Sequence, residues 1–124
     1  MANEAMRTVN FIHTEMKDDL IVSFALCLAD DPTDVESLTC LRTPKYEWFL
    51  EERERGVKVS FELEKKGHLK DVAFDRNAAA VYLRTSECSF ELDLKRVDSA
   101  EIKEMLKVLK VMNFDGSFKI SVLQ

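Results

Sequence analysis

The chain has 124 residues, of which 46% are hydrophobic and 33% are charged, and it contains only 3 glycines and 2 prolines. This composition is typical of a single ordered globular domain over residues 1–124, and it excludes disordered and collagen-like chains. The formal net charge of -5 at pH 7 disfavours binding to nucleic acids and to anionic lipids, because both require clustered Lys and Arg side chains.

Strands are expected in the N-terminal third of the chain. Residues 9–12 indicate a first strand, and the nearly continuous apolar run of residues 20–28 indicates a second one covered on both faces, although its length also permits a buried helix. Residues 16–19 between them predict a hairpin turn. Residues 30–34 predict a break, because Pro lacks a backbone donor and Asp side chains satisfy local amides; this segment has neither the glycine nor the distal glutamate of a calcium loop. Residues 38–41 add a short strand.

A helix signature follows. Thr43 is placed as the N-cap, Pro44 stands at the first helical position and Gly56 lies past the end. These signals predict a short helix near residues 44–54. A competing interpretation makes residues 46–50 a strand.

Four runs of alternating apolar and polar residues follow one another between residues 56 and 94. Side chains of a strand alternate between its two faces, so each run predicts a strand with one core face and one wet face. Breaks at residues 65–67, 75–77 and 85–86 separate the runs and complete a four-stranded antiparallel meander. The expected core positions are Val57, Val59, Phe61, Leu63, Val72, Phe74, Val81, Leu83, Cys88, Phe90, Leu92 and Leu94.

A second helix is predicted after the meander, with Asp98 or Ser99 as its cap and its end near Asn113. A turn at residues 115–116 and alternation over residues 117–123 predict a terminal strand that returns to the same sheet. The apolar stripe of the helix, expected to pack on the sheet, consists of Ile102, Met105, Leu106, Leu109 and Met112.

Together these elements predict an α+β fold. We expect a curved antiparallel sheet of about six or seven strands, with the meander at residues 56–94, a covering C-terminal helix and the shorter helix near residues 44–54.

No catalytic, cofactor or metal site is indicated. His13 and His68, the 2 histidines of the chain, lack an orienting carboxylate and ligand spacing to a cysteine. The 3 cysteines form no Cys-x-x-Cys pair, and we expect them to be free thiols. The glycines are isolated, so the phosphate-binding loops of nucleotide enzymes are absent. No signal-like start and no span of about 18 apolar residues is present, and a cytoplasmic, soluble protein is expected.

The segment of residues 45–55 combines aromatic residues with alternating charges. Exposed Trp, Tyr and Arg side chains supply much of the binding energy of protein interfaces. We therefore predict a non-enzymatic protein-interaction or accessory module, homodimer formation included, whose protein-binding residues are Tyr46, Trp48, Arg53 and Arg55. An alternative interpretation packs these aromatic residues under the helix.

Two further functions stay open at this point. One is a small-ligand-binding or enzymatic domain with an apolar pocket between sheet and helix, lined by Phe61, Phe74, Phe90 and Met105. The other is a toxin-neutralising protein, whose acidic charge would steer a basic partner.

Overall fold

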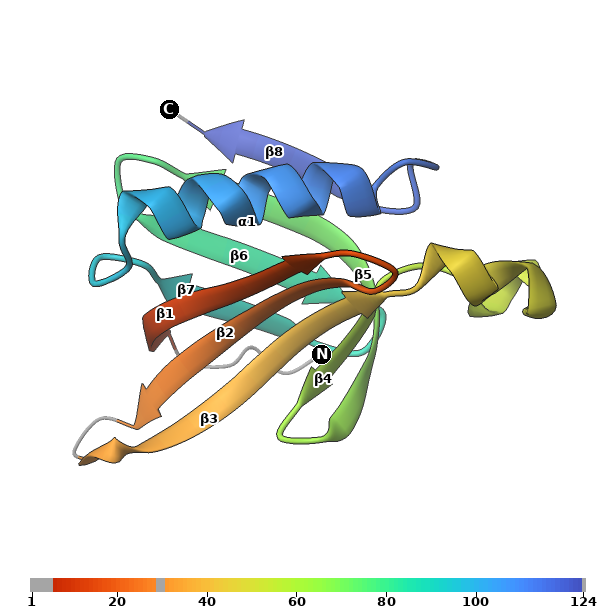
Figure 1. Ribbon diagram of the computed structural model, residues 1–124. Helices are drawn as coiled ribbons and strands as arrows, with labels where there is room; N and C mark the ends of the chain where they lie inside the picture. The colour runs from red at the N-terminus through yellow and green to blue at the C-terminus, as the bar shows by residue number, and fades with distance from the viewer. Residues whose placement is uncertain (1–5, 29–30, 124) are drawn as a thin grey trace.

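The computed structural model describes residues 6–28 and 31–123 and shows a sheet-rich chain with one α-helix (Figure 1). The predicted α+β class is confirmed in this broad form. Within the described residues, no helix combines the length and the apolar character that crossing a membrane requires. In chain order the elements are β1 (Arg7–Met16), β2 (Leu20–Leu28), β3 (Asp31–Arg42), the 3-10 helices η1 (Pro44–Phe49) and η2 (Glu52–Glu54), β4 (Lys58–Phe61), β5 (Glu64–Asp75), β6 (Ala80–Thr85), β7 (Ser89–Asp93), α1 (Ser99–Met112) and β8 (Lys119–Leu123).

The sheet closes into a barrel of seven strands, so the expected curved sheet covered by a helix is wrong in this respect. The order is β4-β3-β2-β1-β7-β6-β5, and β4 also pairs with β5, so the first and last of these strands meet. β5 is long enough to pair with β4 through its first residues and with the eighth strand, β8, through residues 71–75. The strand that closes the barrel is the short β4, which pairs with both β3 and β5. A sequence pattern does not indicate how many neighbours such a strand has. The closure was therefore not predictable from alternation alone.

The β1–β7 seam of the barrel is short and parallel, joining Arg7 to Leu92 and Thr8 to Asp93. The sheet is thus not wholly antiparallel as expected, since β5–β8 is parallel too. Beyond this short β1–β7 pairing, α1 covers β1: it packs against β1 and β2 and runs alongside β1 (Figure 1). The carboxylate of Glu101 on α1 accepts the backbone N–H of Ile12 at 2.7 Å. The helix therefore satisfies an amide of β1 that has no strand neighbour on that side.

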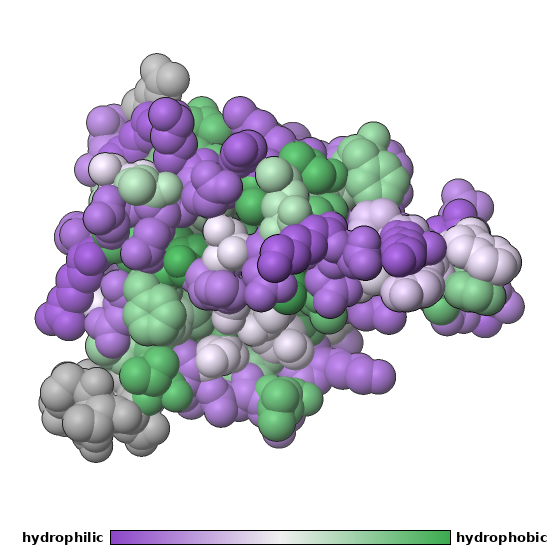
Figure 2. All heavy atoms as spheres, viewed as in Figure 1, coloured by the Kyte–Doolittle hydropathy of each residue, from purple (hydrophilic) through white to green (hydrophobic). Residues whose placement is uncertain are grey.

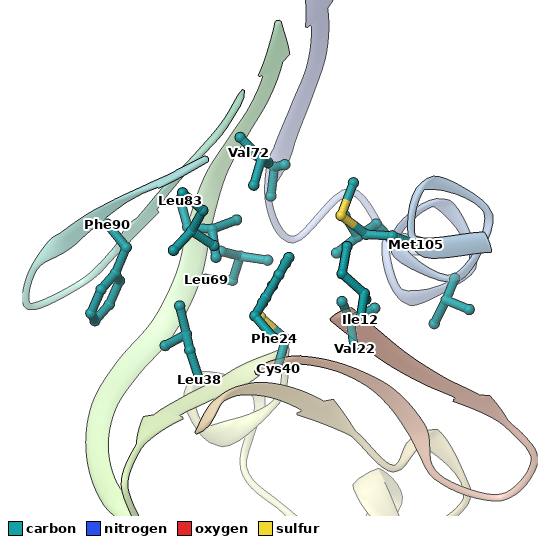
Figure 3. Packing of buried hydrophobic residues seen from close by; sticks show 14 of the residues in the cluster. Ile12, Val22, Phe24, Leu38, Cys40, Leu69, Val72, Leu83, Phe90 and Met105 are labelled. Carbon is teal, nitrogen blue, oxygen red and sulfur yellow. The ribbon is translucent and has the colours of Figure 1, made fainter. Parts of the chain in front are cut away.

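The core fills the barrel and the space under α1. Side chains from both sides of the barrel and Met105 of α1 point toward one another (Figure 3). The predicted helix stripe is confirmed for Met105, Leu106, Leu109 and Met112, which are buried, whereas Ile102 is only partly buried. Asp98 is the N-cap, accepting the N–H of Ala100 at 2.9 Å, and Asn113 ends the helix as predicted.

The N-terminal strands agree with the expected hairpin. β2 occupies residues 20–28 and pairs antiparallel with β1, with Met16 opposite Leu20 at the turn. β3 is much longer than the predicted strand at residues 38–41. The expected break at residues 30–34 lies partly outside the described residues, and the remainder begins β3, where the pairing with β2 shifts between Leu28–Asp31 and Cys27–Val35. A bulge of this kind accommodates a proline that cannot donate to the ladder.

The meander is confirmed as four consecutive antiparallel strands, β4 to β7, but its first turn was misplaced. The chain turns at Glu62 and Leu63, whose φ angles are 49° and 70°, and not at residues 65–67. Leu63 is 98% exposed, so its predicted core position is wrong. Left-handed φ values usually require Gly or Asn. Here Glu62 is held by Ser37, which exchanges hydrogen bonds with its N–H and its carboxylate.

The predicted helix at residues 44–54 is replaced by two 3-10 helices. Pro44 does stand in the first turn, but the Thr43 side chain makes no cap hydrogen bond and donates instead to Asp19 at 2.7 Å. A 3-10 helix turns by about 120° per residue, so the face that an α-helix would bury is not presented to the barrel. The strand alternative for residues 46–50 is wrong as well.

Candidate protein-binding site

The segment between β3 and β4 stands out from the barrel as an arm (Figures 1 and 2). We call residues 44–55 the aromatic arm. Trp48 is 70% exposed, Phe49 66% and Tyr46 54%. The rings of Trp48 and Phe49 stack with their centroids 3.7 Å apart and their planes at 28°. Large apolar rings are normally buried to a greater extent, so three exposed rings on one arm mark a candidate contact surface.

All four predicted site residues lie on or at the end of the aromatic arm, but their environments differ. Tyr46 and Trp48 are exposed, as predicted for Trp48. The Arg53 side chain is exposed and pairs with a neighbouring glutamate of the arm at 2.9 Å. Arg55 donates from Nε and Nη2 to the carbonyl of Leu50, at 3.2 and 3.0 Å. Its guanidinium therefore closes the loop between η1 and η2 and is less free to bind than Arg53.

Glu47, the buried residue of η1, fixes the base of the arm. Its Oε2 accepts from Arg42 Nε and its Oε1 accepts from Arg42 Nη2, each at 2.9 Å. Oε2 also accepts the backbone N–H of Gly56 at 3.3 Å. Arg42 precedes the arm and Gly56 follows it, so one carboxylate ties both ends together. A segment held in this way loses less conformational entropy when it binds.

Arg42 connects this base to the end of α1. Its side chain is buried, and Asp115 accepts from Nη1 at 2.9 Å and from Nη2 at 2.7 Å. Nη1 also donates to the carbonyl of Met112, the last residue of α1, at 2.8 Å. The ring of Phe114 covers the guanidinium, 4.1 Å from its centre. The arm, the end of β3 and the α1–β8 connection therefore meet at one cation.

The electrostatics of this cluster follow from its geometry. Burial alone lowers the pKa of Arg42, but hydrogen bonds and charges from Asp115 and Glu47 outweigh burial and raise that pKa above its usual value. The hydrogen bond from Arg42 is the main cause that holds the pKa of Asp115 well below its usual range, against the opposing effect of burial. Arg42 and Asp115 therefore remain ionised at neutral pH.

Sequence reasoning missed Phe49, Glu47 and Arg42. A usable signal existed for Arg42, because it is in phase with the inward positions Leu38 and Cys40 of β3, all three of which are buried. A charged residue at an inward position requires partners, and those partners could not be located from the sequence.

A hollow of about 450 Å³ opens beside the arm, and we call it the arm hollow. Its size falls within the range typical of ligand and side-chain pockets. Its lining comes mainly from the arm and from the end of β3 and includes the Arg42–Glu47 pair. The lining residues are Asp19, Leu41, Arg42, Thr43, Tyr46, Glu47, Phe49, Leu50, Gly56 and Lys58.

The interior pocket expected between sheet and helix is filled. Phe74, Phe90 and Met105 are buried in one continuous core, and Phe61 packs against it. Three hollows described on the surface of the barrel and beside the arm are each lined by other residues or by Phe90 without the remaining three.

The other reactive side chains show no shared site. His13 lies within β1 and faces Glu15 on the exposed surface, whereas His68 lies within β5, not at a hairpin tip as expected. Cys27, Cys40 and Cys88 are free, and burial raises the pKa of Cys40 to about 12. In the part of the chain that the structure describes, no group of three His, Cys, Asp or Glu side chains could hold a metal ion.

Comparison of the chain with protein families, with curated proteins and with solved structures finds no match. The functional argument therefore depends on the geometry of the aromatic arm and its surroundings.

Proposed function

We propose that the protein is a non-enzymatic protein-interaction module that binds a partner protein through the aromatic arm. One observation carries the proposal: Trp48 is 70% exposed and stacked on Phe49, on an arm whose base is fixed by Glu47. Trp, Tyr and Arg are enriched among the residues that dominate interface energies. A binding segment whose base is already fixed loses less conformational entropy on association.

The arm hollow supplies the complementary half of such an interface. Residues that dominate binding tend to fill pockets on the partner, and an apolar side chain of the partner fits a hollow of about 450 Å³ between Tyr46, Phe49 and Leu50. Trp48 would then lie against the partner's surface. Loss of such a side chain typically costs about 2–4 kcal/mol of binding free energy.

A toxin-neutralising role is an alternative form of the same proposal. It is supported by the net charge of -5, which attracts basic proteins over long range. It predicts that the partner bound by the arm is a basic protein.

The proposal is tested by affinity capture followed by reconstitution. The immobilised protein is compared with Trp48→Ser/Phe49→Ser in lysate of the cells that produce it. A matched control, Phe11→Ser/Met16→Ser, removes two other exposed apolar side chains from β1. The captured protein is then purified and its affinity for all three proteins is measured by calorimetry.

The proposal expects one partner that is retained by the wild type and by the β1 control and lost by the arm variant. Its purified form should bind the arm variant at least about 30-fold more weakly than the wild type, which corresponds to about 2 kcal/mol. Equal affinity for the wild type and the arm variant would contradict the proposal.

A further inference from the structure

A second concave surface lies beside the aromatic arm, on the outer face of the β4–β5 hairpin. Its volume is about 750 Å³, and we call it the hairpin groove. It is bordered by Arg53 and Glu54 of the arm on one side, by Ser86 and Glu87 on the other, and by Leu63 at the hairpin turn.

A β-bulge shapes the floor of the groove. Lys58 pairs with His68 and Ser60 pairs with Lys65, so one residue of β4 opposes Lys66 and Gly67 of β5. The extra residue in β5 turns both Lys65 and His68 to the outer face, although three positions separate them.

The bulge is held in place by the turn that follows β6. Gly67 has a φ of 85°, and a Cβ at this position would collide with the Ser86 hydroxyl. That hydroxyl accepts the backbone N–H of His68 at 3.1 Å, and Thr85 donates to the carbonyl of Lys66 at 2.5 Å. The floor of the groove is therefore fixed before any ligand arrives.

Two of the cations that line the groove have no ion-pair partner among the described residues. Lys58 and Lys65 form no ion pair within the described residues, whereas Arg53 is paired within the arm. Glu54 and Glu87 also line the groove, but neither forms an ion pair with Lys58 or Lys65 within the described residues. Lys58 and Lys65 are therefore the two groove cations whose charge is available to the carboxylates of a ligand.

The spacing of the two lysines selects the shape of the ligand. Lys65 lies opposite Ser60, and Lys58 is two residues from Ser60 along β4. A strand rises by about 3.3 Å per residue, so the lysines are offset by about 7 Å along the hairpin. Alternate side chains of an extended peptide have the same separation and point to the same side. Leu63, exposed at the end of the groove, offers an apolar contact.

We infer that the hairpin groove binds an extended acidic segment of the partner protein, with two carboxylates in alternate positions on Lys58 and Lys65. This inference rests on the proposed function, because Arg53 belongs to both the arm and the groove. The groove recognises carboxylates of the partner, while the arm contacts apolar side chains of the partner.

The probe is a fluorescein-labelled peptide of alternating Glu and Val that ends in Leu, with a matched peptide in which Gln replaces every Glu. Binding is followed by fluorescence anisotropy and by shifts of the amide NMR signals. The groove variant is Lys58→Glu/Lys65→Glu. The charge-matched control is Lys103→Glu/Lys107→Glu, which changes two exposed lysines of α1.

The inference expects binding of the acidic peptide that weakens at least about tenfold in the groove variant and less than about twofold in the α1 control. The signals of β4 and β5 should shift, and affinity should fall as NaCl rises from about 0.05 M to about 0.3 M. Equal binding of the Gln peptide, or no effect of the groove variant, would overturn it. Binding of oligo-dT with the same lysine dependence would also overturn it, since the groove would then be a phosphate site.

The outcome is separable from that of the proposed function. If the peptide fails to bind while the arm variant still loses the captured partner, the groove assignment is wrong and the arm assignment stands. If the peptide binds and the arm variant keeps the partner, the reverse holds.

Discussion

Arg42 and Glu47, five positions apart, join the last residue of β3 to the first turn of the aromatic arm through two parallel hydrogen bonds of 2.9 Å. Arg42 is shared with Asp115, which follows α1. The base of the aromatic arm is thus held by two residues close together in the sequence and by a third that lies 73 positions from Arg42.

Arg42→Met should destabilise the protein strongly. The variant removes a buried cation and with it the hydrogen bonds that Arg42 donates to Glu47 and to the carbonyl of Met112, and breaking a buried ion pair typically costs about 3–5 kcal/mol. Urea unfolding gives the free energy directly. Arg84→Met is the control, since Arg84 forms a more exposed pair with Asp71 and should cost about 1 kcal/mol or less. Similar losses in the two variants would contradict the role assigned to Arg42.

Asp115→Asn should change the dependence of stability on pH. The folded state lowers the pKa of Asp115, mainly through its hydrogen bond from Arg42. Its contribution is therefore complete above the unfolded value of about 3.9 and is lost as pH falls through the lower folded value. We expect the wild type to lose stability below about pH 4 more steeply than the variant. Unfolding by urea at a series of pH values measures the slopes, and Asp18→Asn controls for the change in net charge. Parallel curves for wild type and Asp115→Asn would exclude this coupling.

Gly67→Ala tests the bulge that forms the floor of the hairpin groove. A residue with a Cβ costs about 1–2 kcal/mol in the left-handed region, and here it also meets Ser86. Gly116→Ala is the matched control, because Gly116 has a φ of 70° and its Cβ would meet nothing within 4 Å. Gly67→Ala should therefore cost at least about 1 kcal/mol more than Gly116→Ala in urea unfolding. Equal costs would show that the contact with Ser86 does not constrain the bulge.

β8 offers a route to self-association. It stands at the end of the sheet order and pairs, among the described residues, with β5 alone. We expect two copies to pair through its free edge across a twofold axis. Ser121→Lys places a charge on this strand and should raise the dimer dissociation constant at least about tenfold in sedimentation experiments. Ala100→Lys, at an exposed position of α1, should leave the dissociation constant unchanged. A dimer that persists in Ser121→Lys at normal stability would mean that this edge is not the interface.

Regular periodicity predicted much of the fold. The continuous apolar run of residues 20–28 predicted β2, and the helix cap at Asp98 and the end at Asn113 were both confirmed. These features depend on neighbours in the sequence. Leu63 shows the limit: alternation continued through it, yet the chain turns there because Ser37, 25 positions from Glu62, stabilises the turn.

The candidate site was predicted only in part. Aromatic and Arg residues close together in sequence identified the arm, and the exposure of Trp48 was confirmed. The ion pairs that fix the base of the arm were not predicted, because Arg42 and Asp115 are 73 positions apart and only the folded barrel brings them together. The hairpin groove depends on the bulge at Gly67, which sequence reasoning took for a turn.

The chain contains 1 Trp, so Trp48 reports on the arm without interference from other sites. Fluorotryptophan incorporated into this chain gives one fluorine NMR signal from the indole, even when the partner contains Trp. In the free protein this signal should shift between light and heavy water, as expected for a side chain that is 70% exposed. Titration with the captured partner should move the signal and abolish the solvent shift. A fluorine signal that stays at the same position, with its solvent shift intact, while the partner saturates the protein would contradict the binding role of the aromatic arm.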